Sequence, residues 1–253
     1  MSVQVVKNDH YTVIRMNRPE KRNALSCALM KEMIAALDEI RQDSDQRAVL
    51  FIGEGPVFCS GLDLREMSDL SKSRDSADCL SRLLSIIYSF PLTTVCGVHG
   101  AAVAGGAAIM SACDLVYAEE GAKIWFPEVR KGIVAGFVSA LLQKQMRMRE
   151  MKELLLLGDP VSAQRACEMG LVTRVIPDGS LADETKKVLA QILKGAPQTM
   201  RLSKELLEKL DSSPLEHSWK VAESFHLQSR ASEEAREGAL AFIEKREPKW
   251  LKQ

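Results

Sequence analysis

Short apolar runs alternate with amphipathic segments through the first half of the chain, and this alternation constrains the fold more than any other feature. The run Ala48–Ile52 is apolar at every position, as in a strand buried on both faces. An amphipathic helix with Ser26 as its N-cap precedes it, and a second helix covers about Ala77–Ser89. The run Thr93–Val98 is the next strand. Strand, helix and strand in this order predict a mostly parallel sheet with helices packed against it.

The two ends of the chain have different patterns. The β-branched runs Val3–Val6 and Tyr11–Met16 predict an N-terminal hairpin, and further strands are expected at Leu115–Ala118 and Lys123–Phe126. From about Phe137 onward the pattern is almost all helical, with one short strand at 172–176. We expect helices at 137–146, 149–157, 162–168, 180–194, 198–210, 215–229 and 232–244. The prediction is an α/β core over residues 1–196 and a helical C-terminal region over residues 197–253.

Composition narrows the function classes. The chain of 253 residues is 46% hydrophobic and 27% charged, which is enough apolar material for a sizeable core. It has 34 basic and 34 acidic residues, and this balance argues against a nucleic-acid partner bound through bulk charge. The six cysteines are scattered without a CxxC pair, so we expect free thiols and no metal site. The first residues lack a signal-peptide layout, and we expect a cytoplasmic protein with no membrane partner.

The stretch GAAVAGGAAIMSACD at residues 100–114 holds two adjacent glycines before an expected helix. Gly100 and Gly105 have the spacing of a P-loop, but the next residues are Gly106 and Ala107 where a P-loop needs Lys and Ser or Thr. Two interpretations stay open. The glycines permit tight packing of the helix on the sheet, or a backbone N–H at the helix N-terminus points at a developing negative oxygen. The second interpretation needs another donor from elsewhere in the chain.

Two other segments are candidates for chemistry. The loop FCSGLDL at residues 58–64 follows a buried strand, and its amides around Gly61 are candidates for that other donor. Ser60 lacks a suitably placed histidine for a nucleophile triad, because His99 reads as a residue at the end of a strand. Glu128 follows an apolar strand and precedes the apolar segment GIVAGF. An apolar setting raises the pKa of a carboxyl and suits it to proton transfer near neutral pH.

These segments, in this order, resemble the crotonase superfamily, the enoyl-CoA hydratase/isomerase family. The resemblance covers nearly the whole chain. It is carried by NRPEKRNAL (17–25), FCSGLDL (58–64), VHGAAVAGGAAIMSACDLVYA (98–118), WFPEVRKGIV (125–134), GDPVSAQRACEMGLVTRVIP (158–177) and FIEKREPKW (242–250). It implies the α/β crotonase fold, also called ClpP/crotonase-like, a spiral ββα core followed by a helical C-terminal region.

The resemblance also implies roles for particular residues. The backbone N–H groups of Ser60 and Gly105 would hold the thioester oxygen of an acyl-CoA, and Glu128 would move the proton. The coenzyme A portion would run beside the residues Lys21, Arg22, Ala24, Leu25, Ser60, Gly61, Leu62, Asp63 and Gly105. Either Lys21 or Arg22 would meet a phosphate. No separate cofactor is implied, because coenzyme A belongs to the substrate, and the chain would form a homotrimer or a hexamer through residues 197–253.

One departure from the family pattern bears on the reaction. Hydratases of the family use two glutamates, and the first of these positions is Ala108 here, whereas Glu128 keeps the second. The further Asp of the dienoyl isomerases and some hydrolases falls near Val134–Gly136, which has no acid. A single glutamate resembles the Δ3,Δ2-enoyl-CoA isomerases, and we expect that activity.

Four alternatives stay open. The chain could be a hydratase that uses Glu128 alone, or a catalytically silent acyl-CoA-binding protein. Decarboxylation and thioester hydrolysis also begin from the same oxyanion hole. The sequence does not give the length of the acyl chain, whose pocket walls we expect at Met67–Ser76 and in the helices after Phe137.

Overall fold

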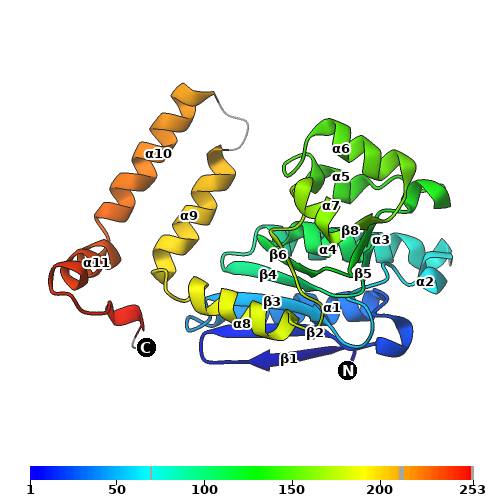
Figure 1. Ribbon diagram of the computed structural model, residues 1–253, viewed down its shortest axis with the longest axis horizontal. Helices are drawn as coiled ribbons and strands as arrows, with labels where there is room; N and C mark the ends of the chain where they lie inside the picture. The colour runs from blue at the N-terminus through cyan, green and yellow to red at the C-terminus, as the bar shows by residue number, and fades with distance from the viewer. Residues whose placement is uncertain (69, 211–213, 252–253) are drawn as a thin grey trace.

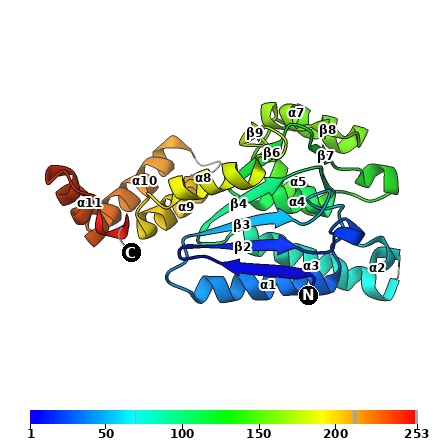
Figure 2. The same ribbon diagram turned by 60° about the horizontal axis from the view of Figure 1, so that its bottom comes forward.

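A six-stranded sheet lies at the base of the computed structural model, which describes residues 1–68, 70–210 and 214–251. Its strands lie side by side in the order β1-β2-β3-β4-β6-β9 (Figures 1 and 2). Their bounds are β1 (Val3–Lys7), β2 (Tyr11–Met16), β3 (Ala48–Gly53), β4 (Thr93–Val98), β6 (Leu115–Glu119) and β9 (Arg174–Ile176). The first two strands are antiparallel, and every other neighbouring pair is parallel. The predicted hairpin and the predicted parallel sheet are confirmed.

Strand β3 shows why its sequence is apolar at every position. Successive side chains of a strand point to opposite faces of the sheet. Val49 and Phe51 face the main core, whereas Ala48 and Leu50 face a second, smaller core on the other side. The main core contains α1 (Cys27–Gln42), α3 (Leu70–Tyr88) and α4 (Gly105–Ala112), and the smaller core contains α8 (Leu181–Ile192). The sheet is therefore covered by helices on both faces.

A second sheet of three short strands lies beside the first in the described part of the chain. It consists of β5 (Ala101–Val103), β7 (Lys123–Trp125) and β8 (Val161–Ser162) in that order. The sequence did not predict β5 or β8, because strands of three and two residues are too short to show an alternating pattern. At Gly100, between β4 and β5, a side chain would lie 2.1 Å from the Pro56 carbonyl oxygen, and the backbone has φ +60°. This crossing from one sheet to the other therefore requires glycine.

The helices confirm most of the predicted positions and correct two boundaries, one of which is the end of the helix expected at 137–146, since α5 (Gly136–Leu142) ends four residues earlier. Ser26 caps α1 as expected, since its side chain accepts a hydrogen bond from the Leu29 N–H. Helix α3 begins seven residues before the predicted start at Ala77. The polar sequence SKSRDS before Ala77 has no apolar periodicity to indicate a helix. The short helix α2 (Leu64–Ser68) was not predicted either.

The helical second half is as the sequence indicated, and its last part lies to one side of the sheets (Figure 1). Its elements are α5 (Gly136–Leu142), α6 (Met148–Lys152), the π-helical turn η3 (Glu153–Leu157), α7 (Ala163–Glu168), α9 (Pro197–Leu210), α10 (Leu215–Arg230) and α11 (Glu233–Ile243). Three 3₁₀ turns complete the described chain: η1 (Pro19–Lys21), η2 (Glu128–Lys131) and η4 (Lys249–Leu251). In their described residues, α9 and α10 bury no side chain, and α11 buries Ala241.

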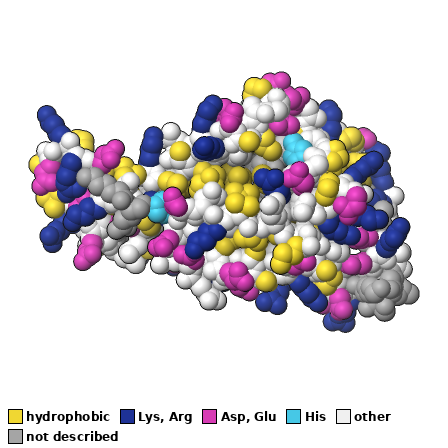
Figure 3. All heavy atoms as spheres, turned by 90° about the horizontal axis from the view of Figure 1, so that it is seen from below, with side chains coloured by type: hydrophobic (Ala, Val, Ile, Leu, Met, Phe, Trp, Pro, Cys, Tyr) yellow, Lys and Arg dark blue, Asp and Glu magenta, His cyan; other side chains and the backbone are white. Residues whose placement is uncertain are grey.

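One face of the molecule carries charged side chains of both signs. On the face shown in Figure 3, basic and acidic side chains are interspersed around a central group of hydrophobic ones. The described residues of that face therefore offer no broad basic surface of the kind that nucleic acids bind. None of the helices in the described ranges is long and apolar enough to cross a membrane.

Candidate functional site

A cavity of about 280 Å³ brings together the residues that the sequence singled out. Ser60, Gly105 and Glu128 all line it, and so does Ala108. The other lining residues are Leu62, Ser76, Ala77, Leu80, Ala104, Pro127, Lys131, Ile133, Val134, Ala135, Gly136, Phe137 and Val138. Ser76 and the first residues of α5, from the segments where we expect the walls of an acyl pocket, line this cavity. Residue 69, within the expected stretch Met67–Ser76, lies outside the described residues.

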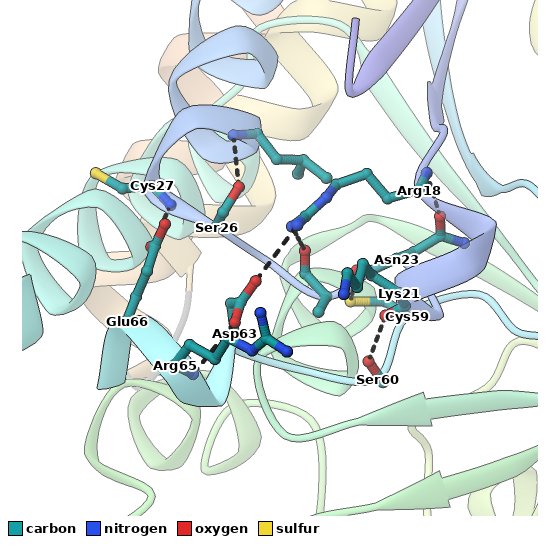
Figure 4. Close-up of polar contacts among 12 residues, drawn as sticks. Arg18, Lys21, Asn23, Ser26, Cys27, Cys59, Ser60, Asp63, Arg65 and Glu66 are labelled. Carbon is teal, nitrogen blue, oxygen red and sulfur yellow. Dashed lines mark hydrogen bonds and ion pairs between the residues drawn. The ribbon is translucent and has the colours of Figure 1, made fainter. Parts of the chain in front are cut away.

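The loop after β3 is held in place by a buried amide that the sequence analysis did not single out. Asn23 is fully buried, and its side-chain nitrogen donates to the carbonyl oxygens of Glu54 at 2.8 Å, Val57 at 2.9 Å and Phe58 at 3.1 Å. Its side-chain oxygen accepts from the Arg18 N–H at 2.9 Å. Figure 4 shows it between the two loops. Asn23 thus joins the segment NRPEKRNAL to the loop that carries Ser60.

The two segments expected beside coenzyme A lie side by side. The Leu25 N–H donates to the Gly61 carbonyl at 2.8 Å, and the Asp63 N–H donates to the Leu25 carbonyl at 3.0 Å, as in a short parallel bridge. The Asp63 carboxylate lies 3.4 Å from the Arg18 guanidinium, which also donates to the Ala24 carbonyl at 2.7 Å (Figure 4). Asp63 therefore has a structural role in joining these segments. Lys21 is the last residue of η1 and Arg22 directly follows it, and both side chains are exposed at the start of the same junction.

The two glycines of the stretch 100–114 have different surroundings. At Gly106 an added Cβ would lie 2.6 Å from Cys59 Cβ and 2.7 Å from the Cys59 carbonyl oxygen, so the close-packing interpretation is confirmed there. Gly105 is the first residue of α4, and an intrahelical carbonyl cannot accept its N–H. Its N-cap residue Ala104 supplies no side-chain cap. Gly105 also lies close to Gly61, where an added Cβ would be 3.5 Å from the Gly105 nitrogen.

The backbone of Ala104 is in a conformation that is rare for residues with a side chain. It has φ 48° and ψ −116°, outside the helical and extended regions. Its N–H donates to the Trp125 carbonyl at 2.8 Å, and its carbonyl accepts from the Ala108 N–H at 2.8 Å. Such conformations are concentrated at active sites, where the surrounding structure holds them in place. This one directly precedes the amide of Gly105.

The backbone N–H of Ser60 already has a hydrogen-bond acceptor, whereas its expected role requires this N–H to bind a thioester oxygen. Its N–H donates to the Arg22 carbonyl at 3.0 Å, and its side chain donates to the Lys21 carbonyl at 3.5 Å (Figure 4). A ligand oxygen would accept a hydrogen bond from this N–H either by sharing it with the Arg22 carbonyl or by replacing that carbonyl. The sequence could not reveal this contact, because it joins two loops that are far apart in the chain.

Glu128 is the one residue with a carboxyl group among the described residues that line the cavity. It is half-buried at the start of η2, and its Oε2 atom is buried without a hydrogen-bond partner in the described structure. Burial raises the pKa of Glu128, whereas a hydrogen bond from its own backbone and the nearby charge of Lys131 act in the opposite direction. Lys131, three residues later in the same 3₁₀ turn, was not singled out by the sequence analysis.

The rest of the cavity is mainly apolar. Ala108 on α4 is 3% exposed and provides no second carboxylate, and Val134, Ala135 and Gly136 provide none where a further acid was considered. Within the described ranges, no group of three or more His, Cys, Asp or Glu residues could hold a metal ion. The site can therefore present backbone N–H groups to an oxygen and one carboxylate to a proton.

Comparisons with known proteins identify the family and the fold. A Thermus thermophilus protein provisionally named enoyl-CoA hydratase is 38% identical over 253 residues, 98% of this chain and all of that protein. A Legionella pneumophila structure provisionally described as an enoyl-CoA hydratase/isomerase, or crotonase, matches with a TM-score of 0.93, 29% identity and 98% of each chain. The enoyl-CoA hydratase structure from Bacillus anthracis matches with a TM-score of 0.94, 27% identity and 98% of each chain. The crotonase fold is thereby confirmed. The model of the enoyl-CoA hydratase/isomerase family matches residues 7–253, and the chain belongs to this family.

Proposed function

We propose that the chain is an acyl-CoA isomerase that moves a double bond from position 3 to position 2 of an enoyl-CoA. One observation supports this activity above the others. Glu128 supplies the one carboxyl among the described lining residues, and Ala108 stands where hydratases of the family have their first glutamate. A single carboxylate suffices to take a proton from one carbon and return it to another.

The proposed reaction has two proton transfers. The Glu128 carboxylate removes a proton from C2, and the electrons of the C–H bond move into the thioester as an enolate. The thioester carbonyl then re-forms, the enolate electrons become the second bond between C2 and C3, and the electrons of the C3–C4 double bond take the proton from Glu128 at C4. The raised pKa of Glu128 suits both steps, because the group must act first as a base and then as an acid.

Backbone amides stabilise the enolate in this proposal. The Gly105 N–H at the start of α4 is the first donor, since the helix leaves it without an intrahelical acceptor. The Ser60 N–H is the second donor and exchanges or shares its bond to the Arg22 carbonyl when the thioester oxygen arrives. One donor aimed at a developing oxyanion contributes about 3–4 kcal/mol to the transition state in other enzymes. Coenzyme A lies along residues 21–25 and 60–63, with Lys21 or Arg22 at a phosphate.

A hydratase that uses Glu128 alone is the second candidate, because relatives such as the Bacillus anthracis protein are called enoyl-CoA hydratases. Water held by one carboxylate would be positioned less well than water held by two. We therefore expect slow hydration at most from this site.

A trimer or a dimer of trimers is the assembly that we propose. Helices α9 and α10 bury no side chain in their described residues, although they carry large apolar groups. The exposed apolar residues of this region include Leu207, Leu215, Trp219, Leu227, Phe242 and Ile243. A second subunit would cover them, since large exposed apolar patches commonly mark protein contacts.

One pair of assays tests the activity. Purified protein is incubated with a 3-enoyl-CoA and, separately, with a 2-enoyl-CoA, and the absorbance of the conjugated thioester is followed. Turnover of the 3-enoyl substrate alone supports the isomerase, whereas hydration of the 2-enoyl substrate alone refutes it. Binding of acyl-CoA without either reaction would indicate a silent binding protein.

The role of Glu128 is tested with a matched pair of variants. Glu128→Gln should lower isomerisation by at least about 10²-fold, because the amide cannot transfer the proton. Glu120→Gln changes an exposed glutamate directly after strand β6 that does not line the cavity, and it should leave the rate unchanged. Near-normal activity of Glu128→Gln would remove Glu128 from the mechanism.

A further inference from the structure

A hydroxyl group lies buried and unpaired in the wall of the cavity. Ser76 on α3 is 2% exposed, and its Oγ atom has no hydrogen-bond partner among the described residues. Buried hydroxyl groups are almost always hydrogen-bonded, because leaving water without a new partner is unfavourable. An unpaired one at a ligand cavity therefore indicates a partner that arrives with the ligand.

Three buried or half-buried hydroxyls on other helices show what Ser76 lacks. Ser111 donates to the Ala107 carbonyl at 2.9 Å, Ser139 to the Ala135 carbonyl at 2.7 Å, and Thr185 to a carbonyl four residues earlier. A serine in a helix can satisfy itself in this way wherever no other partner exists. Ser76 makes no such bond in the described structure, so its hydroxyl remains available.

The neighbouring wall is hydrocarbon. Ala77 and Leu80 line the cavity from the same helix, and Ala108 and Val138 line it from α4 and α5. If the wall at position 76 contacted only the methylene groups of an acyl chain, alanine would serve there as well as serine. The serine is thus an isolated polar position on an apolar surface, and Ser and Thr hydroxyls can both donate and accept a hydrogen bond.

We propose that Ser76 is a specificity-determining residue that hydrogen-bonds an oxygen substituent on the acyl chain, a hydroxyl or a carbonyl beyond the reacting carbons. This inference rests on the proposed function in one respect, namely that the cavity receives the acyl group of an acyl-CoA. In the free protein the hydroxyl has no hydrogen-bond partner among the described residues, and burial keeps it from bulk water. An unsubstituted chain leaves the hydroxyl without a partner, whereas a chain with an oxygen at the right carbon supplies one.

The experiment measures binding of saturated acyl-CoAs, which carry no double bond to isomerise. Calorimetry compares an unsubstituted medium-length acyl-CoA with ligands of equal length that carry one hydroxyl, moved along the chain carbon by carbon and in both configurations. We expect at least one hydroxylated ligand to bind about tenfold more tightly than the unsubstituted one, the effect of one hydrogen bond in a buried site.

Two variants identify the group responsible. Ser76→Ala should abolish the preference and should bind the unsubstituted ligand at least as tightly as the wild type. Ser85→Ala, which changes an exposed serine on the same helix, should retain the preference. The proposal is overturned if no hydroxylated ligand is preferred, or if Ser76→Ala keeps the preference. A preference without any isomerisation would refute the proposed reaction and leave this inference standing, whereas failure of every acyl-CoA to bind would refute both.

Discussion

Replacing Gly106 with alanine should destabilise the protein far more than the same change at the neighbouring Gly105. A Cβ at Gly106 would lie 2.6 Å from Cys59 Cβ, 2.7 Å from its carbonyl oxygen and 2.8 Å from its Sγ atom. A Cβ at Gly105 would lie 3.0 Å from a methyl group of Leu25 and 3.7 Å from Leu62. The first position meets backbone, whereas the second meets the flexible end of a side chain.

The size of the effect follows from these contacts. The Cys59 carbonyl accepts the Val103 N–H at 2.9 Å, so moving it strains the contact between the loop and β5. Overpacking of this kind costs about 1–3 kcal/mol, and the bridge bond is worth about 1 kcal/mol. Alanine regains up to about 1 kcal/mol of helix propensity at either position. The net loss is about 1–3 kcal/mol for Gly106→Ala and within about 1 kcal/mol of zero for Gly105→Ala.

Thermal unfolding of the two variants tests this reasoning. In a chain of this size, 1 kcal/mol shifts Tm by about 2–4 °C, so Gly106→Ala should lower Tm by about 2–12 °C. Because Cys59 precedes Ser60, the same variant should also lower kcat/KM in the isomerase assay. Equal Tm values for the two variants, or a larger loss for Gly105→Ala, would show that the contact with Cys59 does not set the cost of a side chain at position 106.

Three further changes have defined outcomes. Asn23→Ala removes four hydrogen bonds of a buried amide and should lower the free energy of unfolding by about 2–4 kcal/mol in urea titrations; an unchanged midpoint would refute this role. Burial raises the pKa of Glu128 above its ordinary 4.5, so the folded chain holds this proton more tightly than the unfolded chain does. This difference contributes fully to the free energy of unfolding below pH 4.5, and the contribution is lost as the pH rises through the pKa of the folded state. Melting curves should therefore show Glu128→Gln gaining stability relative to the wild type as pH rises; a constant difference would contradict the shift. Trp219→Glu, at a side chain that is 71% exposed, should dissociate the assembly in light scattering, and a monomeric wild type would refute the proposed trimer.

Local sequence was enough for much of the fold because long elements carry a repeated signal. Strand β3 is apolar at successive positions, and burial of Ala48 and Phe51 on opposite faces follows directly from that pattern. Helix α1 likewise begins at a recognisable cap, Ser26. Strands β5 and β8 are too short for such a signal, and the first turns of α3 are too polar. Their structure depends on pairing and packing partners elsewhere in the chain.

The candidate site divides in the same way. The sequence by itself showed that Glu128 is a carboxyl between apolar segments and that position 108 has alanine in place of a second acid. Through its motifs it also indicated the family. Tertiary structure alone decided that the Ser60 N–H already donates to the Arg22 carbonyl and that Asn23 joins two loops. It also decided that the Ser76 hydroxyl, in the cavity wall, has no partner among the residues that the structure describes. Chemical identity and local hydropathy are properties of short segments, whereas hydrogen bonding and burial depend on which distant segments fold against each other.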